Sequence, residues 1–316
     1  MSDSAKKFSE ENYKPPYVTK AFKTIKSQAV NSSNDAEDRH FRVQNGLESE
    51  IDLMTLVQLP VRRLKETVAF YTAVLGMALT HPDRSIEGNA FVQTQPKSGP
   101  SLHLLETPES EFRHLHITIN GKREEFLALY VKSLSDLYER LRRADVEIVK
   151  EPLNGCMSFL DPEGHLIGIY ERLDSEINDR FASNITGFRH VQMAVAAPSV
   201  TAAFFERALG FDRTITEEDS LYLSVRGGEE NQPMIRLVRS AKQAGPQLMH
   251  WMLDGQPKHA LELHSKNIGF LKERVLASGG TVKEELAFTS CGGYLKFYTP
   301  DGHYIWVNQD RRYCDY

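Results

Sequence analysis

The stretch HVQMAV at residues 190–195 decides the fold of this chain, together with the residues that follow it. Apolar runs follow at AFF (203–205) and LGF (209–211), and further on at HALEL (259–263) and after PDGH (300–303). The alternating pattern of the first stretch predicts a strand, and the spacing of the next two predicts an amphipathic helix that ends at the glycine. The order is therefore a strand, a helix and further strands.

The first half of the chain repeats this pattern. Three matches are 134 residues apart and a fourth is 138 apart: AFY/AFF (69 and 203), HITING/HWMLDG (116 and 250), LYER/LKER (137 and 271), and DPEGHLI/TPDGHYI (161 and 299). A repeat of this length indicates duplicated structural units. We therefore expect a first module at 51–172 and a second at 186–316 with a short C-terminal tail. A polar linker at 173–185 joins them, and a mobile polar arm spans 1–50.

The duplicated order resembles the vicinal oxygen chelate superfamily, which contains glyoxalases, extradiol dioxygenases and bleomycin-resistance proteins. The resemblance covers about 250 of the 316 residues. It implies an α+β fold of two tandem vicinal oxygen chelate modules. Each module would consist of paired βαβββ units that form a curved mixed sheet around a cup. In an arrangement like that of extradiol dioxygenases, the second module holds the working cup.

Composition excludes several classes of function. The net charge of −5 argues against nucleic acid or an anionic membrane as partner, and no apolar run is long enough to span a bilayer. The N-terminal residues lack the apolar core of a signal peptide. Cys156, Cys291 and Cys314 form no paired framework, as expected for reduced thiols in a cytoplasmic protein. The remaining partner class is a small-molecule substrate or ligand, and a homo-oligomer is compatible with the sequence.

The resemblance places metal ligands at set positions of the second cup. His190 and His259 occupy the two imidazole positions, whereas Trp306 stands where the family has a glutamate. The corresponding positions of the first module hold no recognisable set: Leu56, Phe126, Gly168 and His103. Two imidazoles with an oxygen donor suit Fe(II), with Mn or Zn as other choices. The competing interpretation of His190 and His259 is that both are structural, inward-facing histidines.

Other positions of the second cup suggest roles in catalysis and substrate binding. Arg236 replaces the additional ligand of glyoxalases and suits an anionic substituent. His250 and Tyr304 are candidates for proton transfer. Substrate-binding candidates beside Arg236 are Trp306, Tyr294 and Cys291.

Three functions remain open on the sequence. The first is a metal-dependent oxygenase or lyase acting on a small aromatic or vicinal-oxygen substrate in the C-terminal cup. The second is a metal-free binding protein of the antibiotic-sequestering kind, with the ligand stacked on aromatic side chains. The third is a metal-free isomerase that uses the two cup histidines as acid and base. An enzyme is favoured over a binding protein because two inward histidines are unusual in an apolar cup.

Overall fold

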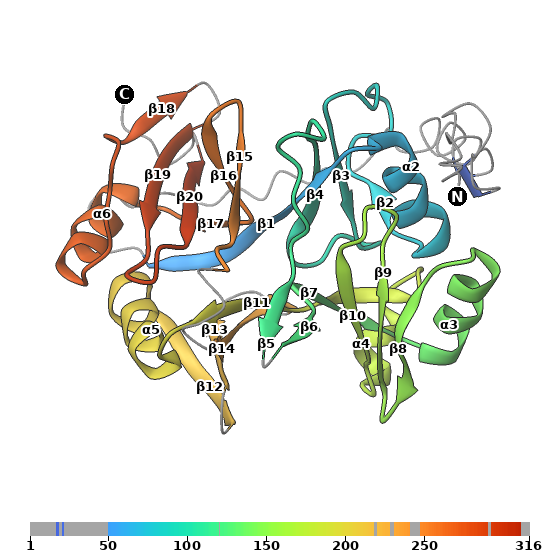
Figure 1. The fold of residues 1–316 in the computed structure, drawn as a ribbon. Coiled ribbons are helices and arrows are strands. Elements are labelled where there is room, and N and C mark those ends of the chain that lie inside the picture. Colours follow the sequence, from blue (N-terminus) through green and yellow to red (C-terminus); the bar gives the residue numbers. More distant parts are fainter. Residues whose placement is uncertain are drawn as a thin grey trace, which may run out of the picture.

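The computed structural model describes residues 17–18, 21, 50–119, 121–217, 220–227, 231–240, 247–289 and 292–310. Four βαβββ units follow one another, with a β-hairpin inside each half of the chain (Figure 1). Units 1 and 2 contain β1 (Ile51–Val61), α2 (Leu64–Ala69), η1 (Phe70–Val74), β2 (Ala78–Leu79), β3 (Asn89–Gln93), β4 (Ser101–Glu106), the hairpin β5 (Ile117–Ile119) and β6 (Lys122–Glu124), β7 (Leu127–Val131), α3 (Leu134–Arg143), β8 (Ile148–Leu153), β9 (Cys156–Leu160) and β10 (Leu166–Glu171).

After α4 (Ser175–Asp179), the second half repeats this order. Units 3 and 4 contain β11 (Ile185–Val195), α5 (Pro198–Phe204), η2 (Phe205–Leu209), β12 (Phe211–Glu217), β13 (Ser220–Val225), β14 (Met234–Arg239), the hairpin β15 (His250–Leu253) and β16 (Gln256–His259), β17 (Leu261–Ser265), α6 (Ile268–Ala277), β18 (Ala287–Thr289), β19 (Gly292–Tyr298) and β20 (Tyr304–Asp310). The predicted α+β architecture of paired βαβββ units is confirmed.

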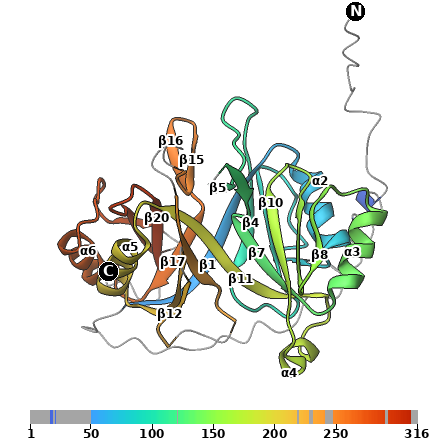
Figure 2. The same ribbon diagram turned by 60° about the horizontal axis from the view of Figure 1, so that its bottom comes forward.

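The units pair across the two halves of the chain. One mixed sheet has the strand order β18-β19-β20-β17-β1-β4-β3-β2, and the other has β12-β13-β14-β11-β7-β10-β9-β8. Unit 1 therefore pairs with unit 4, and unit 2 with unit 3. Figure 1 shows β1 running from the red strands of unit 4 to the cyan strands of unit 1, and Figure 2 shows β11 making the equivalent crossing.

This pairing corrects the expectation that each half closes a sheet of its own. The central contacts are antiparallel, β1 with β17 and β11 with β7. A strand at a unit's open edge needs a partner for its backbone groups, and either half can supply one. Each cup is therefore composite, with strands from both halves of the sequence.

Local sequence signals explain the helices. The helix α3 begins after its N-cap Ser133, whose side chain accepts from the Asp136 backbone N–H at 3.2 Å. Asn267 caps α6 in the same way at 3.0 Å, as expected for a side-chain oxygen before a first turn. Gly210 ends the α5–η2 helix with φ of 79°, which a glycine adopts without strain.

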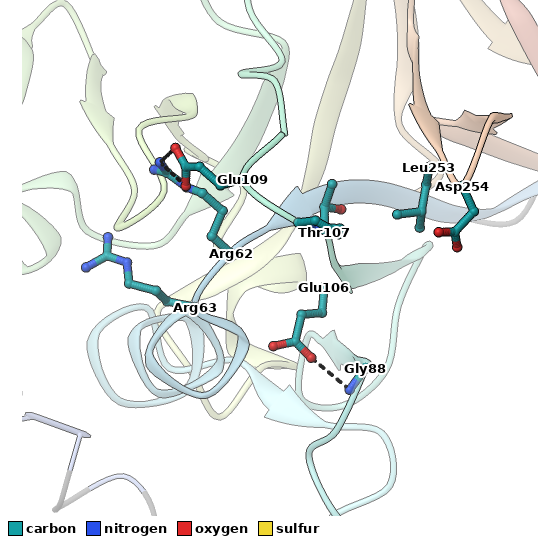
Figure 3. Close-up of a pocket in the computed structure, with 9 residues that line it drawn as sticks. Arg62, Arg63, Gly88, Glu106, Thr107, Glu109, Leu253 and Asp254 are labelled. Carbon is teal, nitrogen blue, oxygen red and sulfur yellow. Dashed lines mark hydrogen bonds and ion pairs between the residues drawn. The ribbon is translucent and has the colours of Figure 1, made fainter. Parts of the chain in front are cut away.

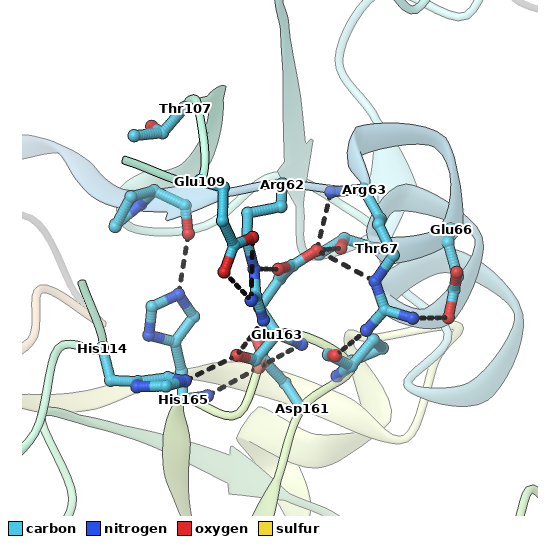
Figure 4. Close-up of polar contacts among 12 residues, drawn as sticks. Arg62, Arg63, Glu66, Thr67, Thr107, Glu109, His114, Asp161, Glu163 and His165 are labelled. Atoms are coloured by element: carbon cyan, nitrogen blue, oxygen red, sulfur yellow. Dashed lines mark hydrogen bonds and ion pairs between the residues drawn. The ribbon is translucent and has the colours of Figure 1, made fainter. Parts of the chain in front are cut away.

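The two units of one half are held together at the turn before the last strand. Glu163 of the Pro-Glu-Gly turn is buried beneath the start of α2 (Figure 4). Its carboxylate accepts from Arg62 Nε at 3.0 Å, from the Arg63 backbone N–H at 2.8 Å and from Thr67 Oγ1 at 3.2 Å. Arg62 also pairs with the exposed Glu109 at 3.0 Å. The glutamate therefore joins unit 2 to unit 1 without any shared sheet.

The histidine after each such turn has a structural role. His165 accepts from the Leu115 backbone N–H at Nδ1 and contacts the Pro60 carbonyl through Nε2 at 2.7 Å. His303 does the same with Met249 and with Ala194, at 3.2 and 2.9 Å. Because Nδ1 accepts, Nε2 carries the proton and donates to the carbonyl. Each ring thus ties a turn to the end of the strand that opens the preceding unit.

The expected N-terminal arm, 1–50, lies almost entirely outside the described residues. Tyr17, Val18 and Ala21 are described, and they pack against Ala69 of α2 and Phe70 of η1. Within the described residues, no helix is both long enough and apolar enough to cross a membrane.

Candidate functional site

Each sheet presents a row of three paired residues made of an aromatic ring, a basic side chain and a glutamine. In the sheet of units 1 and 4 the backbone register aligns Phe91 with His103 and His103 with Gln58. In the other sheet it aligns Tyr222 with Arg236 and Arg236 with Gln192. His103 and Arg236 therefore occupy equivalent positions, and so do the two glutamines.

The first cluster consists of Gln58, His103, His259, Glu262 and Trp306. Gln58 Nε2 lies 2.6 Å from His103 Nδ1, and the imidazole stacks on Phe91 with ring centroids 4.1 Å apart. His103 Nε2 and Gln58 Oε1 are buried and have no hydrogen-bond partner among the described residues. Buried polar atoms normally have partners, so these two atoms suggest that a ligand, ion or water completes the site.

Glu262 supplies an anionic group to the first cluster. Its carboxylate accepts from Thr55 Oγ1 at 3.1 Å and from Asn308 Nδ2, and its Oε2 lies 3.3 Å from His259 Nε2. The His259 ring stacks on Trp306 at 4.3 Å, and Trp306 pairs with Glu262 in the strand register. Residue 306 is a tryptophan where the family has a glutamate. Glu262 of β17, its partner in the strand register, places a carboxylate beside it.

The protonation states in this cluster follow from burial and from the neighbouring groups. Burial alone would raise the pKa of the Glu262 carboxyl, but its contacts with His259, Asn308 and Thr55 outweigh this effect and lower the pKa below its usual value. Burial, together with His259, lowers the pKa of His103 to about 4. At neutral pH the cluster therefore contains an ionised carboxylate and a neutral His103.

The second cluster consists of Glu125, Tyr170, His190, Gln192 and Arg236. Arg236 Nη1 donates to Gln192 Oε1 at 2.9 Å, which orients the amide nitrogen of Gln192 away from the guanidinium. Glu125 Oε1 accepts from the Tyr170 hydroxyl at 2.9 Å and lies 3.9 Å from His190 Nε2. Burial, reinforced by the arginines at 189 and 236, lowers the pKa of His190 well below its ordinary value, so the ring is neutral.

The structure does not bring His190 and His259 together. His190 lies in β11 with Tyr170 and Tyr222 beside its ring, whereas His259 contacts Glu262 and Trp306 of the other sheet. Units 3 and 4 belong to different sheets, so the two histidines lie in separate clusters rather than in the one cup expected in the second module.

The other predicted residues divide between the two clusters. His250 and Tyr304 approach each other with ring centroids 6.1 Å apart, and Tyr294 lies 5.8 Å from Trp306, all beside the first cluster. Arg236 belongs to the second cluster. Cys291 lies outside the described residues.

A pocket of about 780 Å³ lies apart from both clusters, where β1 and β4 end and the β15–β16 hairpin turns (Figure 3). Arg62 and Arg63 line it, but Arg62 pairs with Glu109 and Glu163, and Arg63 pairs with Glu66. Both arginines are already paired with carboxylates, so the polar clusters on the sheets are the better candidate sites.

Sequence reasoning missed Gln58, Gln192, Glu125 and Glu262. A signal for the glutamines was present, because VQ recurs at 57–58 and 191–192 with the same 134-residue offset as the rest of the repeat. Within the described ranges, no three His, Cys, Asp or Glu side chains converge closely enough to hold a metal ion as they stand. A metal at the first cluster would therefore require its imidazole rings to turn.

Comparisons with known proteins agree with this architecture. Residues 53–169 match the Glyoxalase/Bleomycin resistance protein/Dioxygenase superfamily. This match covers units 1 and 2, in the first half of the chain. A glyoxalase I mutant from Zea mays superposes with a TM-score of 0.63 at 16% identity, over 84% of this chain and 95% of that one. An inferred dioxygenase from Bacillus subtilis gives 0.60 at 18% identity, over 83% and 86%.

No curated protein matches the sequence significantly. At these identities the structural likenesses establish the vicinal oxygen chelate fold of the chain. The chemistry of the two clusters has to be argued from their own residues.

Proposed function

We propose that this vicinal oxygen chelate protein is a metal-dependent enzyme whose site is the first cluster, between β1, β4, β17 and β20. The observation that carries the proposal is the ionised Glu262 beside the imidazoles of His259 and His103, with His103 Nε2 lacking a partner among the described residues. Two histidines and one carboxylate form a donor set suited to Fe(II) or Mn(II).

The residues fit such an ion in donor chemistry. A glutamine amide can be placed in either of two orientations. With Gln58 Oε1 toward His103 Nδ1, the imidazole carries its proton on Nδ1 and presents the Nε2 lone pair. This is the arrangement by which an outer-shell group commonly orients a metal-bound histidine. His103, His259 and Glu262 are the proposed ligands, and Gln58 is the positioning residue.

A divalent ion held there would polarise two adjacent oxygens of a small substrate. His250 and Tyr304 lie on the same side of the sheet as Trp306 and could move the proton. Burial, together with Arg113, lowers the pKa of His250, so its ring is a neutral base at pH 7. Burial raises the pKa of Tyr304 to about 12, so its hydroxyl remains a donor. Trp306 and Tyr294 would supply a surface for an aromatic substrate.

A metal-free binding protein is the second candidate. The stacking of His259 on Trp306, with Tyr294 and Tyr304 at their edges, favours it because it forms an aromatic surface. In that case His103 and His259 would act as hydrogen-bonding groups for a ligand rather than for an ion.

Metal analysis of anaerobically purified protein separates the two. We expect near-stoichiometric Fe or Mn by ICP-MS in the wild type, and its loss in His103→Ala and in Glu262→Gln. His190→Ala, which changes the other sheet, serves as the matched control and should keep the metal. Absence of metal after reconstitution with Fe(II) and Mn(II) would refute the enzyme proposal in this form and leave the binding protein.

A further inference from the structure

The two clusters occupy equivalent positions on the two sheets, but their side chains have different chemistry. Across one sheet the register aligns Lys296, Trp306, Glu262 and Leu56. Across the other, the equivalent row is Ser158, Gly168, Ala128 and His190. Large side chains in the first row are replaced by three small ones in the second. Where the first cluster has an indole, the second has Gly168 with the side chain of Glu125 lying over it.

The second cluster contains hydrogen-bond donors that the described residues do not satisfy. Gln192 is fully buried, its Oε1 is used by Arg236, and its Nε2 has no partner among the described residues. His190 is also fully buried, and Arg189 Nη1 lies 3.4 Å from its Nδ1. Because a guanidinium only donates, His190 Nδ1 accepts and Nε2 carries the proton. That Nε2 has no hydrogen-bond partner among the described residues either.

These donors come from one face of β11, next to a guanidinium held by Gln192. Arg236 is held by Gln192 and lies 5.5 Å from the Tyr222 ring, and His190 lies between the rings of Tyr170 and Tyr222. Arg236 and Tyr170 are partly exposed, so the cluster reaches solvent on their side. A guanidinium together with amide and imidazole N–H groups is complementary to the oxygens of a carboxylate.

We propose that the second cluster is a separate, metal-free binding site for a small organic carboxylate. The carboxylate oxygens accept from Arg236, Gln192 Nε2 and His190 Nε2, and the body of the molecule lies against the Tyr222 ring. Glu125, which the Tyr170 hydroxyl holds over Gly168, closes the site on the other side. The site does not depend on metal in the first cluster.

The test uses a matched pair of ligands, benzoate and benzamide, which have similar shapes and differ in charge. In a ligand-observed NMR titration of the full-length protein we expect saturable binding of benzoate and at least tenfold weaker binding of benzamide. Arg236→Gln should weaken benzoate binding at least tenfold. His103→Ala, at the equivalent position of the first cluster, should leave it unchanged.

A second variant keeps the test decisive if Arg236→Gln unfolds. Gln192→Glu preserves the shape of the side chain and places a carboxylate against Arg236, so it should abolish benzoate binding while thermal unfolding shows that the protein is folded. The proposal fails if the wild type does not bind benzoate, if benzamide binds equally well, or if binding survives in Gln192→Glu. It also fails if His103→Ala abolishes binding, since the ligand would then occupy the first cluster.

Discussion

The side chain of Glu125 lies over Gly168, in the space that a larger side chain at position 168 would occupy. A Cβ built on Gly168 would lie 3.0 Å from Glu125 Cγ, closer than ordinary van der Waals contact. The equivalent pair in the other sheet is His259 and Trp306, which stack at 4.3 Å. One sheet has Trp306 facing His259, and the other has Gly168 facing Glu125. The two positions of each pair therefore differ together between the sheets.

Gly168→Ala should therefore lower the free energy of unfolding by about 1–2 kcal/mol, because the new methyl group displaces a buried carboxylate. Urea unfolding measures this loss. In a Glu125→Ala background the same substitution should cost markedly less, since the clash is gone. Equal losses in both backgrounds would show that Glu125 does not limit position 168.

Glu163→Gln should destabilise the protein by about 2–4 kcal/mol, because it leaves Arg62 and Arg63 facing a neutral amide in a buried turn. Glu109→Gln is the matched control: it removes the other carboxylate on Arg62, which is 78% exposed. Exposed pairs contribute roughly 0–1 kcal/mol. Thermal or urea unfolding compares the two variants, and similar losses would contradict the structural role of Glu163.

Stability should fall as the pH drops from 6.5 toward 4. Burial lowers the pKa of His303 from 6.5 to about 4, so in this window the unfolded chain binds a proton that the folded chain does not. The stabilisation is complete above pH 6.5 and is lost on acidification, at a cost of about 3 kcal/mol for this one group. Urea unfolding at pH 7 and pH 4.5 should show it. His303→Ala should be less stable at pH 7 and should lose less on acidification, and an unchanged pH dependence would contradict the assignment.

His103→Arg should remove metal and leave the protein folded. Arg236 shows that an arginine fits beside a glutamine and an aromatic ring at this place in the sheet. ICP-MS checks the loss of metal, and circular dichroism checks the fold. Leu102→Arg, one residue away and fully buried, is the control and should unfold the protein, because an unpaired buried charge is costly. Metal retained in His103→Arg would exclude His103 as a ligand.

The sequence was sufficient to predict the units but not their partners. The helix at 134–143 was predictable because its cap and its apolar spacing are local signals. The repeat likewise indicated four units. Pairing is different: a repeated unit presents a similar open edge wherever it occurs, so β1 could satisfy its backbone groups with a strand from either half.

The same limit applies to the candidate site. His259 and Glu262 are three residues apart, and strict alternation along one strand would place them on opposite faces. Because β16 ends at His259 and β17 begins at Leu261, the alternation is interrupted and the two side chains meet. Arg236 could be identified as an anion-binding candidate, but its partner Gln192 was overlooked beside His190.

The cross-pairing of the units also determines what a fragment of this chain can do. A polypeptide of residues 50–184 alone would leave β1 and β7 without the strands that complete their sheets. Two copies could satisfy each other if β1 of one paired with β7 of the second, giving a twofold dimer with the strand arrangement of the full-length monomer. In the intact chain the linker makes this encounter intramolecular and raises the effective concentration of the partner. Separately expressed halves should therefore reassociate when mixed, and each composite site should appear only in the reassembled protein.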